Sequence, residues 1–112
     1  MLVEVYTKTK ANFSFQPNFA LNVGAFNGTI DNSLTYHNGM KFSTKDKNQD
    51  IYQCAVTFGF GAWWYNACHS SNLNGPNFGH AKADSKSMCW YGFPKSGQYI
   101  SLKTIKMALR KQ

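Results

Sequence analysis

The sequence predicts an α+β domain dominated by short antiparallel strands and long loops. Two observations support this prediction. Apolar residues recur with a strand-type period in several short segments, and Gly, Asn and Ser are frequent between them. Aromatic residues make up 16% of the 112 residues and charged residues only 15%. This mixture suits a loop-rich binding domain better than a helical bundle, and a chain of this length forms one domain at most.

The predicted elements follow from local patterns. Residues 19–23 alternate well and end at Gly24, so they are predicted to form a strand. Residues 54–58 read as a short apolar strand, whereas residues 69–88 have no period and are predicted to be a loop. The tail is ambiguous, because residues 102, 105 and 109 fit a helix face while 105, 107 and 109 fit a strand. Tight turns are expected at three Asn-Gly pairs, at residues 27–28, 38–39 and 74–75.

The formal net charge is +7. Such a balance permits contact with an anionic polysaccharide, a membrane surface or a nucleic acid, although a solvated basic surface is the simpler interpretation. Nucleic-acid recognition is not expected, because arginine is scarce and no recognisable motif is present. The sequence contains no apolar run long enough to span a membrane. Its first residues are too few and too polar for a signal peptide.

The three cysteines leave one unpaired after any disulfide forms. Spacing alone allows either Cys54–Cys68 or Cys68–Cys89. A thiolate metal site is not expected, because no two cysteines have two-residue spacing and His37, His69 and His80 are scattered. An enzyme that pairs Cys68 or Cys89 with His69 lacks an acidic residue to orient the histidine, so the chain is predicted to be non-catalytic.

Four ordered blocks resemble the fibrinogen-related domains, the family of fibrinogen chains, ficolins, tachylectins, tenascins and angiopoietins. The most specific block begins at Gly61 and carries three adjacent aromatics followed by Cys68 and His69. The other three blocks are residues 54–58, residues 32–46 and residues 99–103 with Met107 and Arg110. The resemblance covers roughly residues 17 to 110 and leaves residues 1–16 as an unmatched N-terminal segment. Residues 17–112 are therefore read as the C-terminal half of such a domain, truncated at its N-terminal side.

The resemblance implies several structural features. It favours the Cys54–Cys68 bridge, with Cys89 as a small buried residue or an exposed thiol that links to a partner chain. It implies a strand in the tail, a cis peptide bond between Ala67 and Cys68, and a secreted protein. Two sequons, Asn12-Phe13-Ser14 and Asn27-Gly28-Thr29, are then candidate glycosylation sites.

The segment before Cys54 resembles the calcium loop of the family. Oxygen side chains at every second position can converge on one hard cation if the backbone curls. The side chains that match the family ligands are those of Asn48 and Asp50, and the Tyr52 carbonyl matches a third ligand. Asn48 replaces an acid, and the loop reaches Cys54 about two residues early, so the expected Ca²⁺ affinity is weak.

The resemblance also implies an acetyl-binding pocket around Cys68. In ficolin-like and tachylectin-like members, backbone amides beside the cis bond bind the carbonyl of an acetyl group, and aromatic rings enclose its methyl. Phe58, His69 and Ala83 match wall positions here, with Ala67 and Cys68 at the bond itself. A neighbouring wall tyrosine has no match, so Tyr91 or Tyr99 would have to substitute for it. Trp63 and Trp64 are interpreted as core residues.

The predicted function is lectin-like, calcium-supported binding of acetylated glycans, of the innate-defence, venom or agglutinin type. The alternatives are a protein-interaction module that uses the same pocket for a peptide, as in angiopoietin-like members, and a non-functional truncated copy. A homo-oligomer is also compatible with the resemblance.

Overall fold

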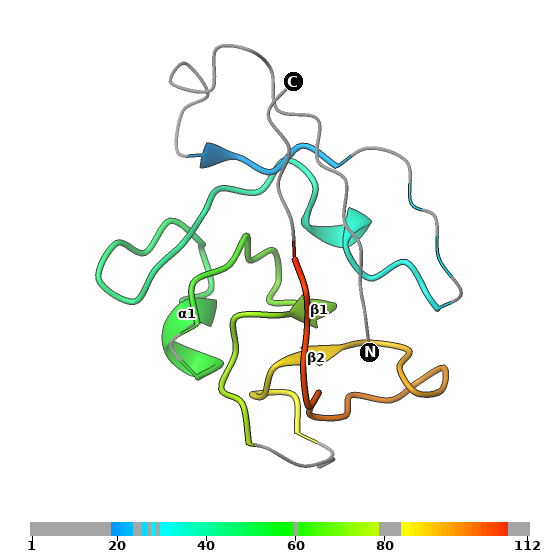
Figure 1. Ribbon diagram of the computed structural model, residues 1–112. Helices are drawn as coiled ribbons and strands as arrows, with labels where there is room; N and C mark the ends of the chain where they lie inside the picture. Colours follow the sequence, from blue (N-terminus) through cyan, green and yellow to red (C-terminus); the bar gives the residue numbers. More distant parts are fainter. Residues whose placement is uncertain are drawn as a thin grey trace.

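The computed structural model describes residues 19–23, 26, 28, 30–59, 61–78 and 84–107. Regular elements are few within these ranges (Figure 1). They are the 3₁₀ helix η3 (Thr35–His37), the single-turn helix α1 (Cys54–Thr57), and the strands β1 (Ser71–Asn72) and β2 (Cys89–Trp90). The two strands pair antiparallel, with Ser71 opposite Trp90 and Asn72 opposite Cys89. Together with long irregular segments, these elements form the predicted α+β architecture.

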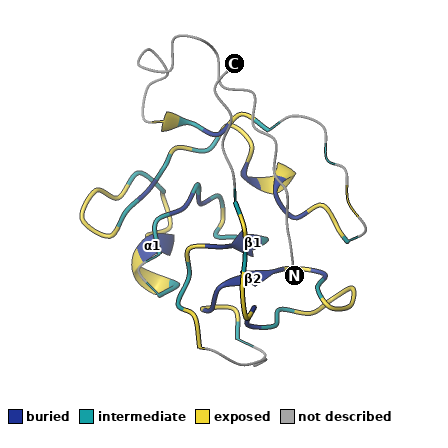
Figure 2. Ribbon diagram, in the orientation of Figure 1, coloured by how far each residue is buried: buried dark blue, intermediate teal, exposed yellow. Residues whose placement is uncertain are grey.

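Two tryptophans lie at the centre of the core. Trp63 and Trp90 are both 0% exposed, and Figure 2 shows the buried segments gathered around the β1–β2 pair. The Trp90 indole donates to the Asp31 carbonyl at 2.7 Å. Trp64 is only partly buried and packs against the core cluster, so the core assignment of Trp63 is confirmed and Trp64 lies at the edge of the core. The remaining buried apolar residues are Leu21, Leu34, Cys54, Ala55, Tyr65, Leu73, Met88 and Leu102.

Two predicted strands are wrong. Residues 54–57 form α1, because the Asp50 carboxylate accepts the Cys54 N–H at 2.6 Å and Phe58 N donates to the Cys54 carbonyl at 2.8 Å. Residues 19–23 do not form a strand either. The Phe19 backbone is left-handed, with φ of 52°, and only Leu21 in this segment is buried. Leu21 bonds to the Gly39–Met40 backbone, so this segment lies along a turn, and only Val23 in it forms an isolated β-bridge.

Two further predictions need correction. The predicted loop 69–88 contains β1, because His37 accepts the Ser70 and Ser71 amides and holds the chain against β2. In the tail, residues 102–107 contain no strand, although Leu102 N donates to the Met88 carbonyl beside β2. Residues 108–112 lie outside the described residues, as do both glycosylation candidates, Asn12 and Asn27.

The turn at Asn38–Gly39 is confirmed and has a clear cause. Met40 N donates to the His37 carbonyl at 3.1 Å, and Gly39 has φ of +78°. Asn38 has φ of −61° and ψ of 134°, so the pair forms a type II turn, which needs a positive φ at its third residue. At Asn74–Gly75 a turn also forms, with Gly75 N bonded to the Asn72 carbonyl. Any side chain at Gly75 would meet the Ser87 carbonyl oxygen at 2.5 Å.

Candidate functional site

A small pocket forms around the loop that joins Tyr65 to Ser70. It encloses about 210 Å³ and is lined by Phe58, Ala67, Cys68, His69, Ser85 and Tyr99. The Ala67–Cys68 peptide bond is cis. The loop closes on itself, because Asn66 N donates to the Cys68 carbonyl at 2.9 Å. The pocket therefore has a backbone floor, and side chains from distant segments form its walls.

Three aromatic rings make up the walls. The Phe58 and His69 ring centres are 4.8 Å apart with an interplanar angle of 86°, and those of His69 and Tyr99 are 5.6 Å apart at 89°. The Tyr99 hydroxyl donates to the His69 carbonyl at 3.1 Å. Edge-to-face contacts of this kind are favourable and fix ring orientation. The hollow that remains is therefore apolar on its sides.

His69 is held as a neutral imidazole. Its Nε2 lies 2.7 Å from the Ser85 carbonyl, which can only accept, so Nε2 carries the proton. Burial lowers the pKa of His69, against the opposing effect of the Ser85 carbonyl. The other ring nitrogen, Nδ1, is buried without a hydrogen-bond partner. The ring is thus oriented by one bond and contributes mainly an apolar face.

Polar groups on the pocket floor are available to a ligand. Within the described part of the chain, the backbone N–H groups of Cys68 and His69 donate no hydrogen bond. Both residues line the pocket and are only partly buried. An unbonded amide beside an apolar hollow favours a ligand that brings a carbonyl oxygen and a small apolar group.

The loop is positioned by His37, a residue for which no role was predicted from the sequence. Its Nδ1 lies 2.8 Å from the Trp64 carbonyl, and its Nε2 accepts the Ser70 and Ser71 N–H groups at 3.1 and 3.2 Å. His37 is 0% exposed, and burial lowers its pKa to about 4. One neutral imidazole therefore joins both ends of the pocket loop. No local sequence pattern around His37 predicts that its side chain bonds to both ends of this loop.

Most predicted pocket residues come together. Phe58, Ala67, Cys68 and His69 all line the same hollow, whereas Ala83 lies outside the described residues. Tyr99 supplies the wall for which no direct match exists, and Tyr91 stands beside it, with ring centres 5.0 Å apart. Sequence reasoning missed Ser85, because it lies in a segment with no period.

The predicted calcium loop curls around a serine hydroxyl. Ser43 Oγ lies 3.1 Å from Asn48 Oδ1 and 2.8 Å from Asp50 Oδ2, and it accepts the Gln49 N–H at 2.9 Å. The two side-chain oxygens thus converge as expected, while the Tyr52 side chain lies at the rim, 58% exposed. The other Asp50 oxygen, Oδ1, accepts the Cys54 N–H. This donor set has one carboxylate already engaged by two donors, so it fits only weak coordination of a cation that takes 6–8 oxygens.

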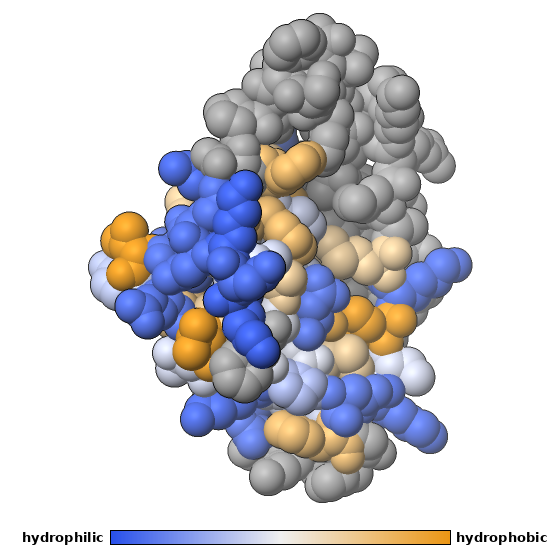
Figure 3. Space-filling model, turned by 90° about the vertical axis from the view of Figure 1, so that its left-hand side faces the viewer, coloured by the Kyte–Doolittle hydropathy of each residue, from blue (hydrophilic) through white to orange (hydrophobic). Residues whose placement is uncertain are grey.

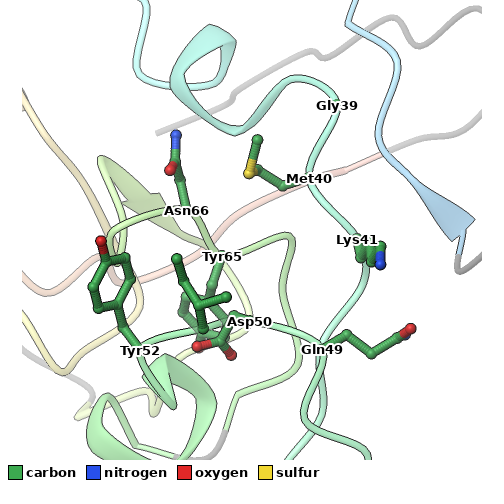
Figure 4. Close-up of a pocket in the computed structure, with 9 residues that line it drawn as sticks. Gly39, Met40, Lys41, Gln49, Asp50, Tyr52, Tyr65 and Asn66 are labelled. Atoms are coloured by element: carbon green, nitrogen blue, oxygen red, sulfur yellow. The ribbon is translucent and has the colours of Figure 1, made fainter.

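A second hollow, of about 300 Å³, lies beside this loop (Figure 4). The side chains of Met40, Asn66 and Tyr52 surround it, whereas that of Gln49 extends away from it. Ile51 is 85% exposed at its edge. On this face apolar groups form separate patches among hydrophilic ones (Figure 3). No sequence motif predicted this hollow.

The cysteines occupy different environments. Cys54 and Cys68 form a disulfide, which ties α1 to the pocket loop. Cys89 is free and 0% exposed, and burial raises its pKa to about 12. A protonated, inaccessible thiol cannot link to a partner chain or act as a nucleophile. In the ranges that the structure describes, no helix is long and apolar enough to cross a membrane.

Comparisons with known proteins agree with this architecture. The chain matches the family "Fibrinogen beta and gamma chains, C-terminal globular domain" over residues 3–112. It is 38% identical over 109 residues to "Fibrinogen-like protein A" of Apostichopus parvimensis, which covers 94% of this chain and 38% of that protein. It is 40% identical over 94 residues to "Tenascin-R" of Gallus gallus, covering 82% of this chain and 7% of that protein.

A solved structure shows the same fold. The fibrinogen-like globe domain of human ANGPTL2 superposes with a TM-score of 0.63 at 40% identity, covering 77% of this chain and 41% of that one. The chain thus spans less than half the length of these relatives. The family match begins at residue 3, whereas the resemblance seen in the sequence begins at roughly residue 17; the domain boundary at residue 17 stays a prediction. On this evidence, the chain belongs to the family of fibrinogen C-terminal globular domains.

Proposed function

We propose that this chain is a non-catalytic, extracellular recognition domain that binds acetylated glycans. The observation that carries the proposal is the pocket at Ala67–Cys68, in which Phe58, His69 and Tyr99 surround a backbone floor. The acetyl methyl would fill the apolar hollow, and its carbonyl oxygen would accept from the Cys68 and His69 amides. The hollow of about 210 Å³ has room for an acetyl group on the backbone floor, with the sugar that carries it toward the open side.

Retention on acetylated agarose tests the proposal. We expect the protein to bind the resin and to elute with N-acetylglucosamine but not with glucose, because only the former carries the acetyl group. Phe58→Ala removes one wall of the pocket and is expected to lower affinity about 10-fold. Phe78→Ala, which removes an exposed ring outside the pocket lining, serves as the matched control. Elution by glucose, or equal loss in both variants, would contradict the assignment.

We further expect weak calcium binding at Asn48 and Asp50 to support the pocket. α1 begins at Cys54, four residues after Asp50, and the disulfide carries its position to Cys68. With one carboxylate, the affinity should be at or below that of extracellular modules, on the order of 10⁻⁴ to 10⁻³ M. Asn48→Asp adds a second carboxylate beside Asp50 Oδ2 and should raise calcium affinity and acetyl capture together.

Calorimetry at millimolar calcium checks this expectation. Gln98→Glu adds the same charge at an exposed position outside the loop and should change neither quantity. Asp50→Ala is a poorer test, because it also removes the acceptor of the Cys54 N–H and a partner of Ser43. Unchanged calcium affinity in Asn48→Asp would show that the loop is not a metal site.

A protein-interaction role is the second candidate. The exposure of Ile51 and Tyr52 at the second hollow favours it. The apolar patches on that face are separate, whereas large continuous patches are typical of protein interfaces (Figure 3). We therefore rank acetyl-glycan binding first. Free N-acetylglucosamine would release a glycan from the first pocket but not a protein held at the second hollow.

A further inference from the structure

Two exposed tyrosines stand at the mouth of the acetyl pocket. Tyr36 is 40% exposed and Tyr91 is 37% exposed. Tyr36 donates its hydroxyl to the Ala67 carbonyl at 2.9 Å, and Ala67 lines the pocket. The Tyr91 ring lies 5.0 Å from that of Tyr99, which lines the pocket from the other side. We call Tyr36 and Tyr91 the tyrosine rim.

Tyr36 is held through its hydroxyl and its backbone, and Tyr91 is held through its backbone. The Tyr36 carbonyl accepts from the Asn66 side chain at 2.8 Å, so this residue is bonded to the pocket loop through its backbone and its hydroxyl. Tyr91 N donates to the Ser70 carbonyl at 2.8 Å, and its own carbonyl accepts from the Ser33 hydroxyl at 2.7 Å. A tyrosine fixed before binding offers a large amphipathic surface at a small entropic cost.

The two rings belong to the same surface. Tyr36 and Tyr91 both contribute to raising the pKa of Tyr99, after the larger effects of burial and of Cys89. The contacts agree with this arrangement, because the Tyr91 ring lies beside that of Tyr99 and the Tyr36 hydroxyl is bonded to the pocket loop at Ala67. The rim thus continues the wall formed by Phe58, His69 and Tyr99 out to solvent.

We propose that the tyrosine rim is a second subsite, on which the sugar ring next to the acetylated residue packs its apolar C–H face. This inference rests on the proposed acetyl-binding function and names its ligand class as oligosaccharides of at least two rings. An acetyl group bound to the Cys68 and His69 amides would leave the sugar that carries it toward the open side of the pocket. A ring linked to that sugar then lies within reach of Tyr36 or Tyr91. Hydroxyl groups on the sugar edge stay in water, because the rim is open.

Affinity as a function of chain length tests the subsite. The ligands are N-acetylglucosamine and its linked dimer and trimer, titrated calorimetrically against the full chain. The readout is the ratio of trimer affinity to monomer affinity. One ring stacked on a fixed tyrosine should make this ratio about 5-fold to 10-fold in the unmodified protein. Tyr91→Ala should reduce the ratio to about 3-fold, the statistical factor that three acetyl groups give at one pocket, because it removes a stacking surface without removing a residue of the pocket lining.

Two control variants separate the ring from other effects. Tyr36→Phe keeps the ring and loses only the bond to the Ala67 carbonyl, so it should keep a ratio above that of Tyr91→Ala. Phe78→Ala removes an exposed ring that lines neither hollow and should leave the ratio unchanged. If the trimer binds no better than the monomer, or if Tyr91→Ala keeps the ratio of the unmodified protein, the second subsite is refuted. Neither result would contradict acetyl binding in the pocket itself. Failure of every ligand to bind would overturn the proposed function and the subsite together.

Discussion

Acidification from about pH 7 to pH 4 is expected to lower the free energy of unfolding by about 3 kcal/mol, mainly through His37. The pKa of His37 is about 4 in the folded chain, against 6.5 for an unperturbed histidine. Above the unperturbed value both states are neutral, and the full stability is present. Between 6.5 and about 4 only the unfolded chain takes up the proton, so stability falls as the pH falls. Below about 4 both states are protonated and the loss levels off.

The physical cause is the role of Nε2 as an acceptor. It receives the Ser70 and Ser71 amides, and a proton on this nitrogen would leave both donors facing a third donor inside the core. Because those amides hold the pocket loop, acetyl binding should fall over the same pH range. Denaturant titrations at intervals of pH measure the effect.

Two variants assign the pH dependence to one residue. His37→Gln keeps a donor and an acceptor but cannot titrate, so it should be less stable at neutral pH and show a much smaller slope. His69→Gln removes the other histidine whose pKa is lowered, and most of the slope should remain. A full slope in His37→Gln would contradict the assignment.

The family blocks place Phe58, Ala67, Cys68 and His69 in one hollow because these residues lie close together in the sequence and a disulfide joins their two segments. Cys54, Cys68 and His69 stand at fixed spacings, and the aromatic run before them has few structural alternatives. Phe58 and His69 accordingly meet at 4.8 Å. Tyr99 was expected only as a substitute for the missing wall tyrosine. The residues around it do not show how the C-terminal segment is oriented relative to the pocket loop.

Hydrophobic periodicity cannot identify an element as short as α1, because one helical turn does not contain a repeat of the pattern. Residues 54–57 are apolar in sequence, yet the first two are buried and the last two exposed, as on a single helical turn. The deciding contact is the Asp50 carboxylate on Cys54 N, which no propensity encodes. His37 is a similar case. Its importance comes from three hydrogen bonds to residues 27 to 34 positions away, so only the assembled fold shows it.

Loss of the Cys54–Cys68 disulfide is expected to lower the free energy of unfolding by about 3 kcal/mol, the value that the chain-entropy model gives for a loop of about 15 residues. The bridge spans 14 positions and ends at Cys54, which is 0% exposed. For a domain of this size, the loss corresponds to a fall in Tm of roughly 10 to 20 °C. It should also weaken acetyl binding, because the bridge anchors Cys68 in the pocket.

Peptide mapping without reduction and thermal melts with a reductant test the bridge together. Mapping should show Cys54 joined to Cys68 and Cys89 free. Reductant should lower the Tm of the unmodified protein and of Cys89→Ser, whereas the double variant Cys54→Ala/Cys68→Ala should melt at the same temperature with and without it. Cys89→Ser is the matched control, because its thiol is buried and unpaired, so the substitution changes stability without changing sensitivity to reductant. A peptide that joins Cys68 to Cys89 would refute the assigned pairing and, with it, the geometry of the pocket, since Cys54 would no longer tie α1 to the loop that carries His69.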